Sequence, residues 1–507
     1  MNMKKIINII ALGAAVSVLA SCNLDLVPNN AIAYNPEQIV TSQTDLNGFE
    51  NGMLAYFRGT HYGIYSIAPE LMCDGFNAMA DYGNNYGSIH RTDASFSATD
   101  YDAEDSWENL YHAIMRYNVV INGLQENVPE GLEANAALVR GEGYFFRAVS
   151  YLRLVRLYGK AYGHGTPATD LGVPLVLEYD QTARPARNTV QEVYDQVKKD
   201  LDSAAVLLAG VPGAVRAQKP TIDAVNAVYA RYYLDIKDYA NAASSAQKVI
   251  GSAAGYALSS TAEAMEAEWL YDAGNEPVMQ FYASQTENGP RNYDAYTQTA
   301  REGGKDYFRP YFIPSSNLMN LYEAGDLRLA QWYDNSDYQV FYNSDYHSGE
   351  FYVFKKYLGN PDLRAEGTVP NGYQAIKPIL ISEMYLIAAE ANQEAGNDAA
   401  AKTALNTLQS ARGASATAAT AANIHNEWFK ETVGEGTRML CLKRWNEGFS
   451  SRIGQAGAIA NGALAQGAAF ESKSLPAGDF HYQWPIPSHE FEVNSNLVQN
   501  PGYSGAE

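Results

Sequence analysis

The chain of 507 residues has few residues that bind metals or carry out redox chemistry: three cysteines, at 22, 73 and 441, and eight histidines. No two cysteines have the CxxC spacing and no histidines have the HExxH spacing, so the sequence predicts neither a zinc site nor a redox pair. The G-x-S-x-G motif of acyl-transfer enzymes and the phosphate-binding G-x-x-x-x-G-K-S/T loop are also missing. We therefore expect no cofactor, no metal and no catalytic residues.

Positive charge is scarce as well. There are 36 Lys and Arg against 57 Asp and Glu, a net charge of -21. Binding to nucleic acid needs a basic face, which this composition does not supply, so nucleic acid is excluded as a partner. Acidity of this kind favours solubility and does not identify a ligand.

The N-terminus has a short apolar run, from Ile6 to Leu19, preceded by Lys4 and Lys5. Its 14 residues are too few to span a bilayer, which takes about 20, but they suit a signal peptide. The run ends in Leu19-Ala20-Ser21-Cys22, which resembles the lipobox of bacterial lipoproteins. We expect a signal peptide over 1–21, an acylated Cys22 and a lipid-anchored tether over 22–48. The alternative is an ordinary signal peptide followed by an incidental cysteine. Cys73 and Cys441 lie in apolar segments, which favours buried thiols over a disulfide.

Helical periodicity is strongest over 136–158, where apolar residues recur until Gly159. A second helix is predicted from Thr189, a suitable N-cap. The spacing of small residues over 230–246 returns 159 positions later, over 389–405. It resembles the tetratricopeptide helix pair, in which alanines let two antiparallel helices approach closely. Two unrelated helix hairpins would give the same spacing.

Aromatic residues are abundant between these copies. Residues 269–373 hold 22 aromatic residues in 105 positions, interspersed with Gly, Pro, Asn and Asp rather than recurring at the helical period. We expect a loop-rich insertion whose rings bind a ligand, together with the turn Asp81-Tyr82-Gly83-Asn84-Asn85-Tyr86. The alternative for each ring is simple packing. A nearby acidic run, 100–105, is predicted to be a solvated turn, with a cation site as the alternative. The candidate ligand-binding residues are Asp74, Tyr82, Asn85, Tyr86, Tyr282, Tyr293, Tyr296 and Trp332.

Three motifs stand in order along the chain. They are Leu154-Val155-Arg156-Leu157-Tyr158-Gly159, Gly434-Glu435-Gly436-x-Arg438 and a C-terminal segment from Pro485-Ile486-Pro487 to Asn500-Pro501-Gly502-Tyr503, of which the last is the most specific. Together they resemble the SusD/RagB family of outer-membrane nutrient-binding lipoproteins. Departures from the family pattern are Gly141 and Gly143 around Glu142, and Cys441 in place of an aspartate.

This resemblance implies a mostly α-helical fold in which tetratricopeptide-like helix pairs pack against an irregular, loop-rich half that binds the ligand. It implies an N-terminal helical region over 49–260, the aromatic insertion over 261–375 and a C-terminal region over 376–507. The implied function is capture of an oligosaccharide at the surface of the outer membrane and its delivery to a SusC-like TonB-dependent transporter. An oligopeptide ligand, as in the RagB branch, and a surface glycoside hydrolase are the alternatives.

Overall fold

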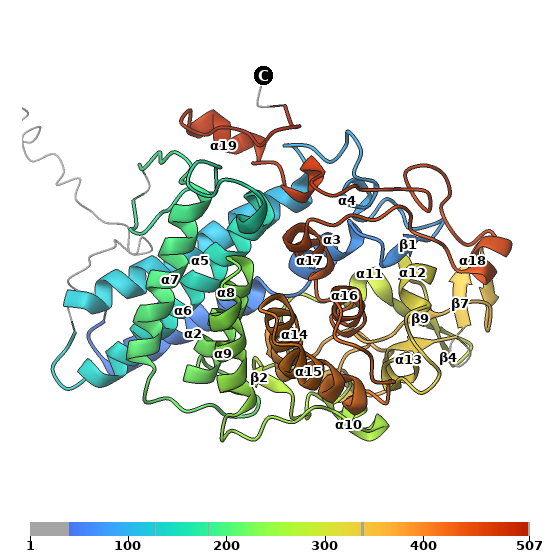
Figure 1. The fold of residues 1–507 in the computed structure, drawn as a ribbon, viewed down its shortest axis with the longest axis horizontal. Helices are drawn as coiled ribbons and strands as arrows, with labels where there is room; N and C mark the ends of the chain where they lie inside the picture. Colours follow the sequence, from blue (N-terminus) through green and yellow to red (C-terminus); the bar gives the residue numbers. More distant parts are fainter. Residues whose placement is uncertain (1–39, 127, 181, 336–338, 505–507) are drawn as a thin grey trace, which may run out of the picture.

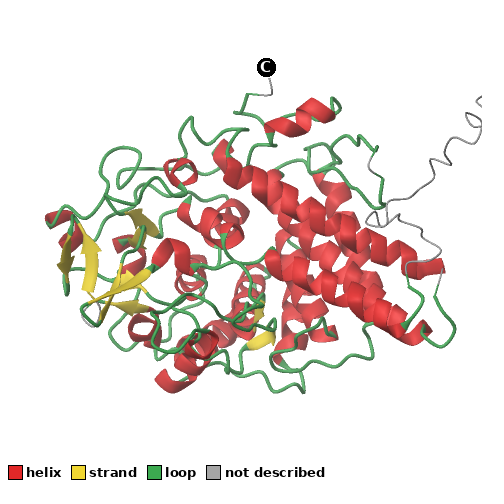
Figure 2. Cartoon of the chain, turned by 180° about the vertical axis from the view of Figure 1, so that it is seen from behind, coloured by secondary structure: helices red, strands yellow, loops and turns green. Residues whose placement is uncertain are grey.

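The computed structural model describes residues 40–504, except 127, 181 and 336–338. Long helices form one side of the molecule, which we call the helical half (Figure 1). Short helices, strands and loops form the other side, the mixed half, and most of the strands gather at its far end (Figure 2). The helical half consists of α2 (Gln43–Gly59), α5 (Tyr101–Glu126), α6 (Glu133–Tyr158), α7 (Val190–Leu207), α8 (Ile222–Asp235), α9 (Tyr239–Ile250), α14 (Ile381–Glu394) and α15 (Asp398–Ala411).

The two strongest helices predicted from the sequence are confirmed as α6 and α7. Gly159 is the C-cap of α6. Thr189 caps α7, where its hydroxyl accepts a hydrogen bond from the Glu192 backbone N–H at 3.2 Å and the Glu192 carboxylate accepts one from the Thr189 N–H at 2.8 Å. This reciprocal capping box satisfies N–H groups that a helix start otherwise leaves without partners.

Two glycines in α6 allow its neighbours to come close. A Cβ atom on Gly141 would lie 2.9 Å from the Cβ of Leu207 in α7, and one on Gly143 would lie 3.0 Å from the Cγ1 of Ile121 in α5. These glycines, which depart from the family pattern, therefore serve close helix packing.

The predicted helix pairs are confirmed as α8 with α9 and α14 with α15. Ala230, Ala246, Ala389 and Ala401 are all fully buried, as expected for small residues at a close helix contact. α14 also packs directly against α9, although 130 residues separate the two helices in the sequence. The two pairs thus form a continuous stack, and the aromatic segment leaves the stack after α9 and returns to it at α14.

The mixed half is built from short elements. Its helices are α3 (Ile64–Leu71), α4 (Gly87–Arg91), α10 (Ala262–Trp269), α11 (Tyr293–Tyr296), α12 (Ser316–Met319), α13 (Leu327–Trp332), α16 (Ala421–Glu431), α17 (Arg438–Trp445) and α18 (Ala456–Ala460), with 3-10 turns at Tyr162–His164, Pro361–Leu363 and Phe480–Tyr482. The short helix α19 (Ser488–Val493) lies against α5 of the helical half, where Glu490 accepts a hydrogen bond from the Trp107 ring N–H at 3.0 Å. Three two-stranded sheets pair β1 (Phe76–Ala78) with β5 (Phe312–Pro314), β2 (Pro277–Met279) with β10 (Ile379–Leu380), and β6 (Tyr333–Asp334) with β9 (Val353–Phe354). A four-stranded sheet has the order β3 (Thr299–Glu302), β4 (Lys305–Phe308), β7 (Gln339–Tyr342) and β8 (Asp345–His347).

The folded body begins earlier than predicted. α2 starts at Gln43 and Leu46 is fully buried, so the last residues of the segment expected as a tether belong to the helical half. The signal peptide, Cys22 and the rest of the tether lie outside the described residues. Cys73 and Cys441 are buried and unpaired, which confirms the expectation of free thiols.

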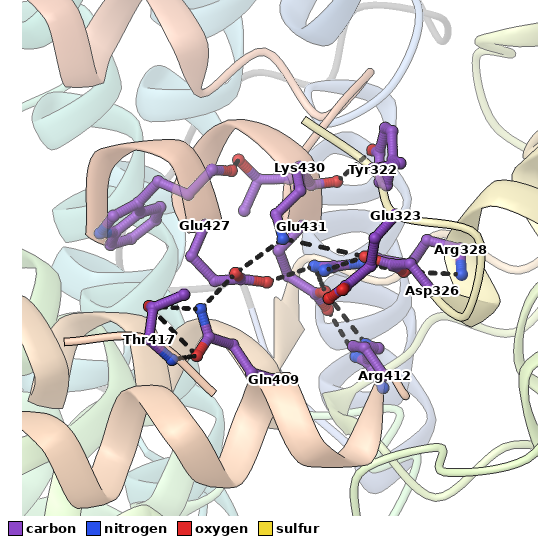
Figure 3. Close-up of polar contacts among 12 residues, drawn as sticks. Tyr322, Glu323, Asp326, Arg328, Gln409, Arg412, Thr417, Glu427, Lys430 and Glu431 are labelled. Atoms are coloured by element: carbon purple, nitrogen blue, oxygen red, sulfur yellow. Dashed lines mark hydrogen bonds and ion pairs between the residues drawn. The ribbon is translucent and has the colours of Figure 1, made fainter. Parts of the chain in front are cut away.

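A buried network of ion pairs joins three segments of the mixed half to α15 (Figure 3). Arg328 contacts Asp326, Glu427 and Glu431 at 2.7 to 2.8 Å. Arg412, at the C-terminal end of α15, binds Glu276 at 2.8 Å and also Glu431. Burial alone would raise the pKa of Glu431, but Arg412 and Arg328 hold it well below its usual range. These charges therefore remain ionised in the interior and fasten α13, α16 and the segment before β2 to the helix stack.

Candidate ligand-binding surface

The turn at 81–86 follows β1 and has an unusual backbone. Gly83, Asn84 and Tyr86 all have positive φ angles, of 65°, 61° and 50°. Arg91 holds the turn from α4, donating to the Tyr82 hydroxyl at 2.8 Å and to Asn84 Oδ1 at 2.6 Å. Strain of this kind persists only where the surrounding contacts fix the chain, and Arg91 supplies such contacts.

Strand pairing places this turn beside the aromatic insertion. Asn77 in β1 pairs with Ile313 in β5, and the Met79 N–H donates to the Tyr311 carbonyl at 2.9 Å. On the other side, the Ala80 N–H donates to the Ala463 carbonyl at 2.8 Å. Segments more than 200 residues apart thus meet at the turn, as the composite site predicted from the sequence would require.

The environment of Tyr86 is acidic. Its ring is half-buried, and burial followed by the charges of Asp102 and Asp294 raises its pKa. Asp102 itself is buried, and burial together with Asp100 and Asp105 raises its pKa to about 7. Asp100 is also buried and caps the start of α5 by accepting from the Ala103 N–H at 3.0 Å. The prediction of a solvated acidic turn is therefore wrong for Asp100 and Asp102.

Three candidate aromatic residues of the insertion are packed inside the protein. Trp332 is 1% exposed, and its ring lies 5.7 Å from that of Trp269 and 4.0 Å from the Lys356 ammonium group. Tyr296 is fully buried against Phe76, with ring centroids 4.6 Å apart. Tyr293 is 6% exposed. In this structure these three rings have little or no surface to offer a ligand.

The remaining candidates divide into paired and accessible residues. Asp74 is buried and forms a bidentate ion pair with Arg438, at 2.8 and 3.0 Å, and Tyr82 is buried beneath the turn. Tyr282 is 53% exposed, and its carbonyl accepts from Arg58 at the end of α2. Asn85 and Tyr86 are half-buried. Of the eight candidates, these last three can be reached from solvent.

An aromatic platform that the sequence analysis missed lies on the four-stranded sheet. Tyr307 of β4, Phe341 of β7 and Tyr346 of β8 stand on one face, with ring centroids 5.0 to 5.9 Å apart. All three rings are half-buried, whereas Val340 and Tyr342, on the opposite face of β7, are buried. This alternation is the period of a half-buried strand, and in the sequence it is visible over only a few residues.

Polar groups border the aromatic platform. The Arg309 guanidinium lies 5.4 Å from the Phe341 ring centroid, and the Tyr346 hydroxyl donates to the carboxylate of Glu302. Arg309 is two residues from Tyr311, whose carbonyl pairs with Met79. The loop between β4 and β5 thus connects the platform to the pairing beside the 81–86 turn, and the four peptide bonds from Tyr307 to Tyr311 span at most roughly 14 Å.

The described residues contain no group of three or more His, Cys, Asp or Glu side chains that could hold a metal ion. In the same part of the chain, no helix has the length and apolar character needed to cross a bilayer.

Two family models match the chain in succession. Residues 24–234 match a SusD-like family described as starch-binding and associating with the outer membrane, and residues 328–503 match the SusD family. The chain belongs to the SusD family. The resemblance seen in the sequence motifs is therefore confirmed.

Relatives along the whole chain agree with this assignment. The SusD-like protein P2 of Formosa agariphila is 26% identical over 531 residues, covering 96% of this chain and 97% of the relative. A SusD superfamily protein of Bacteroides thetaiotaomicron has a TM-score of 0.75 at 24% identity, covering 91% of this chain and all of that one. A protein of Bacteroides vulgatus with a provisional description as sugar-binding has a TM-score of 0.74 at 23% identity. The match covers 92% of this chain and all of that one. The predicted fold class, helix pairs packed against an irregular half, is confirmed.

Proposed function

We propose that this SusD-family protein captures an oligosaccharide at the cell surface and delivers it to a SusC-like TonB-dependent transporter. The observation that carries the ligand class is the aromatic platform of Tyr307, Phe341 and Tyr346 with Arg309 beside it. Sugar rings present C–H faces that stack on aromatic rings, and hydroxyl groups that pair with charged and amide side chains. A structural neighbour at 18% identity, with a TM-score of 0.67, is a laminarin-binding SusD-like protein, which supports the same class.

The proposed site extends from the aromatic platform towards Asn85 and Tyr86 in the 81–86 turn. Each stacked ring contributes roughly 0.5–1.5 kcal/mol beyond the burial of its surface, by analogy with aromatic pairs. Two or three such contacts, set against the loss of freedom on association, correspond to dissociation constants above about 1 μM. In this proposal the protein binds the oligosaccharide without cleaving or modifying it.

Membrane attachment in this proposal depends on an acylated Cys22. Acylation by more than one chain anchors a protein stably, whereas a single chain holds it only marginally. Cys22→Ala should leave a protein that no longer fractionates with membranes from cells lacking the transporter. If that variant still fractionates with them, the anchor lies elsewhere.

The proposed pairing with a transporter is tested by purifying this protein from native membranes in mild detergent. Recovery of a TonB-dependent barrel protein with this chain in constant proportion supports the pairing, and repeated recovery of this chain alone contradicts it.

The ligand class is tested by calorimetry against a panel of plant and host oligosaccharides and a peptide library. Tyr86→Ala and Phe341→Ala should each weaken binding of the glycan that the unaltered protein selects. Tyr56→Ala is the matched control, because Tyr56 is a 40%-exposed tyrosine on α2 in the helical half. Binding of peptides alone would favour the oligopeptide function, and cleavage of the bound glycan would favour a glycoside hydrolase.

A further inference from the structure

A small cavity lies where the helical half meets the mixed half. Its volume is about 100 Å³. This is room for about three water molecules at roughly 30 Å³ each, and well below the roughly 300 Å³ at which pockets for organic ligands begin. Its wall is formed by α3, α6, α8, the segment around Lys377 and the start of α17. The His, Arg, Lys and Glu side chains in the wall are His61, Arg153, Arg156, Arg231, Lys377, Glu383 and Glu435.

Most of these charges are compensated by a partner. Arg156 binds Asp235 at 2.6 Å, Arg231 binds Glu383 at 2.7 Å, and Lys377 binds Asp272 at 2.6 Å. Glu435 binds Lys356 at 2.7 Å.

Arg153 is the exception. Among the described residues no carboxylate lies within ion-pair distance of it. Its half-buried guanidinium makes one hydrogen bond, to the Thr60 carbonyl, and lies 5.6 Å from the centroid of the Tyr65 ring. The cavity therefore carries one positive charge that the protein does not neutralise.

Other buried or half-buried cations without a carboxylate partner show how this chain usually satisfies such groups. Arg187 donates four hydrogen bonds to backbone carbonyls, at 2.7 to 3.3 Å. Lys443 donates to the Arg156 and Gly159 carbonyls at the end of α6, both at 2.6 Å. Arg452 donates to three carbonyls at the end of α3. Arg153 has a guanidinium with five N–H groups but a single carbonyl partner, whereas the other three cations have between two and four.

We infer that this cavity binds a small oxyanion, a carboxylate or phosphate-type ion, through the Arg153 guanidinium. The planar fork of a guanidinium binds such ions through two parallel hydrogen bonds, and a charge partly withdrawn from water is stabilised by an opposite charge. Burial lowers the pKa of Arg153 to about 10, and the charges of Arg231 and Arg156 act in the same direction. A bound anion would offset the repulsion between Arg153 and the positive charges of Arg231 and Arg156. The inference is independent of the glycan site, which lies on another part of the protein.

The test uses the mature full-length protein and three probes: phosphate, sulfate and acetate, each compared with chloride at equal ionic strength. We expect at least one oxyanion to raise the midpoint of thermal unfolding saturably, because a ligand that binds only the folded state stabilises it by mass action. Calorimetry should give one site per chain. A rise that continues in proportion to salt concentration, as for general exclusion of salts from protein surfaces, would overturn the inference.

Substitutions in α6 test whether Arg153 is the residue that binds the anion. Arg153→Gln should abolish the saturable response, and Arg153→Lys should weaken it. Arg140→Gln is the matched control and should keep it, because Arg140 is on the same helix, also donates to one carbonyl, at 3.3 Å, and is not in the cavity wall. In buffer without oxyanions, Arg153→Gln should unfold at or above the midpoint of the unaltered protein. A lower midpoint in that buffer would assign Arg153 a purely structural role, and an unchanged oxyanion response would place the site elsewhere.

Discussion

The helical half and the mixed half are stabilised in different ways. In the helical half, backbone groups pair within the helices, and small residues such as Ala230 and Ala246 let the helices pack closely. In the mixed half the backbone is irregular, so side chains must satisfy its polar groups. Arg452, for instance, donates to carbonyls at the end of α3, and Asn292 accepts from the Gly63 N–H and donates to the Gly434 carbonyl. The comparison shows that buried polar side chains satisfy backbone groups in the mixed half, a task that the long helices largely perform within their own backbone.

The largest effect is expected from breaking the buried ion network. Arg412→Met leaves Glu276 and Glu431 without their main cation, and we expect it to lower the free energy of unfolding by about 3–5 kcal/mol. Chemical denaturation measures the change. Lys198→Met is the control, since it removes an exposed pair with Asp202 and should change stability by less than about 1 kcal/mol. Equal effects of the two variants would show that the network does not stabilise the mixed half.

Where the two halves meet, Asp102 should make the free energy of unfolding depend on pH. Its pKa is about 7 in the folded protein, against about 3.9 when unfolded, so the folded state binds more protons between these values and stability falls as pH rises through them. Asp102→Asn removes this dependence. We expect the variant to be more stable by about 1–3 kcal/mol at pH 7.5, and the gain to vanish below about pH 4.

The control for Asp102 is Glu108→Gln, an exposed acid on the same helix, which should stay within about 0.5 kcal/mol of the unaltered protein. Thermal unfolding from pH 4 to pH 8 measures both variants. A gain that does not change with pH would mean that Asp102 is not the titrating group.

In the helical half, close packing should reverse the usual effect of replacing glycine by alanine. Gly141→Ala gains about 1 kcal/mol in helix propensity, but its new Cβ would lie 2.9 Å from Leu207 Cβ, and such overpacking costs about 1–3 kcal/mol. We expect a net loss of up to about 2 kcal/mol. Gly52→Ala in α2 has no atom within 4 Å of the new Cβ, so it should gain about 1 kcal/mol. Changes of the same sign in both variants would rule out the packing argument.

The sequence predicted the helical half far better than the mixed half, for a physical reason. Periodicity and capping are local, so α6, α7, the Thr189 cap and both helix pairs could be recognised from neighbouring residues. In the mixed half, burial depends on partners far away in the chain: Asp74 pairs with Arg438, 364 residues later. A ring on irregular backbone has no periodic face, so Trp332 in the core and Tyr346 on the surface looked alike.

The smallest expected effect on binding distinguishes an aromatic ring on the surface from one in the core. Tyr346→Ala removes one ring of the aromatic platform and should weaken glycan binding about 2- to 12-fold, which corresponds to about 0.5–1.5 kcal/mol. Tyr346→Phe keeps the ring and loses only the bond to Glu302, so its affinity should stay within about 2-fold if stacking dominates. Calorimetry with the glycan selected by the unaltered protein measures both. The buried Trp332 gives the contrast: Trp332→Ala should lower stability by about 3–5 kcal/mol, whereas Tyr346→Ala should lower it by about 1 kcal/mol or less. Loss of affinity in Tyr346→Phe equal to that in Tyr346→Ala would assign recognition to the hydroxyl instead of the ring face.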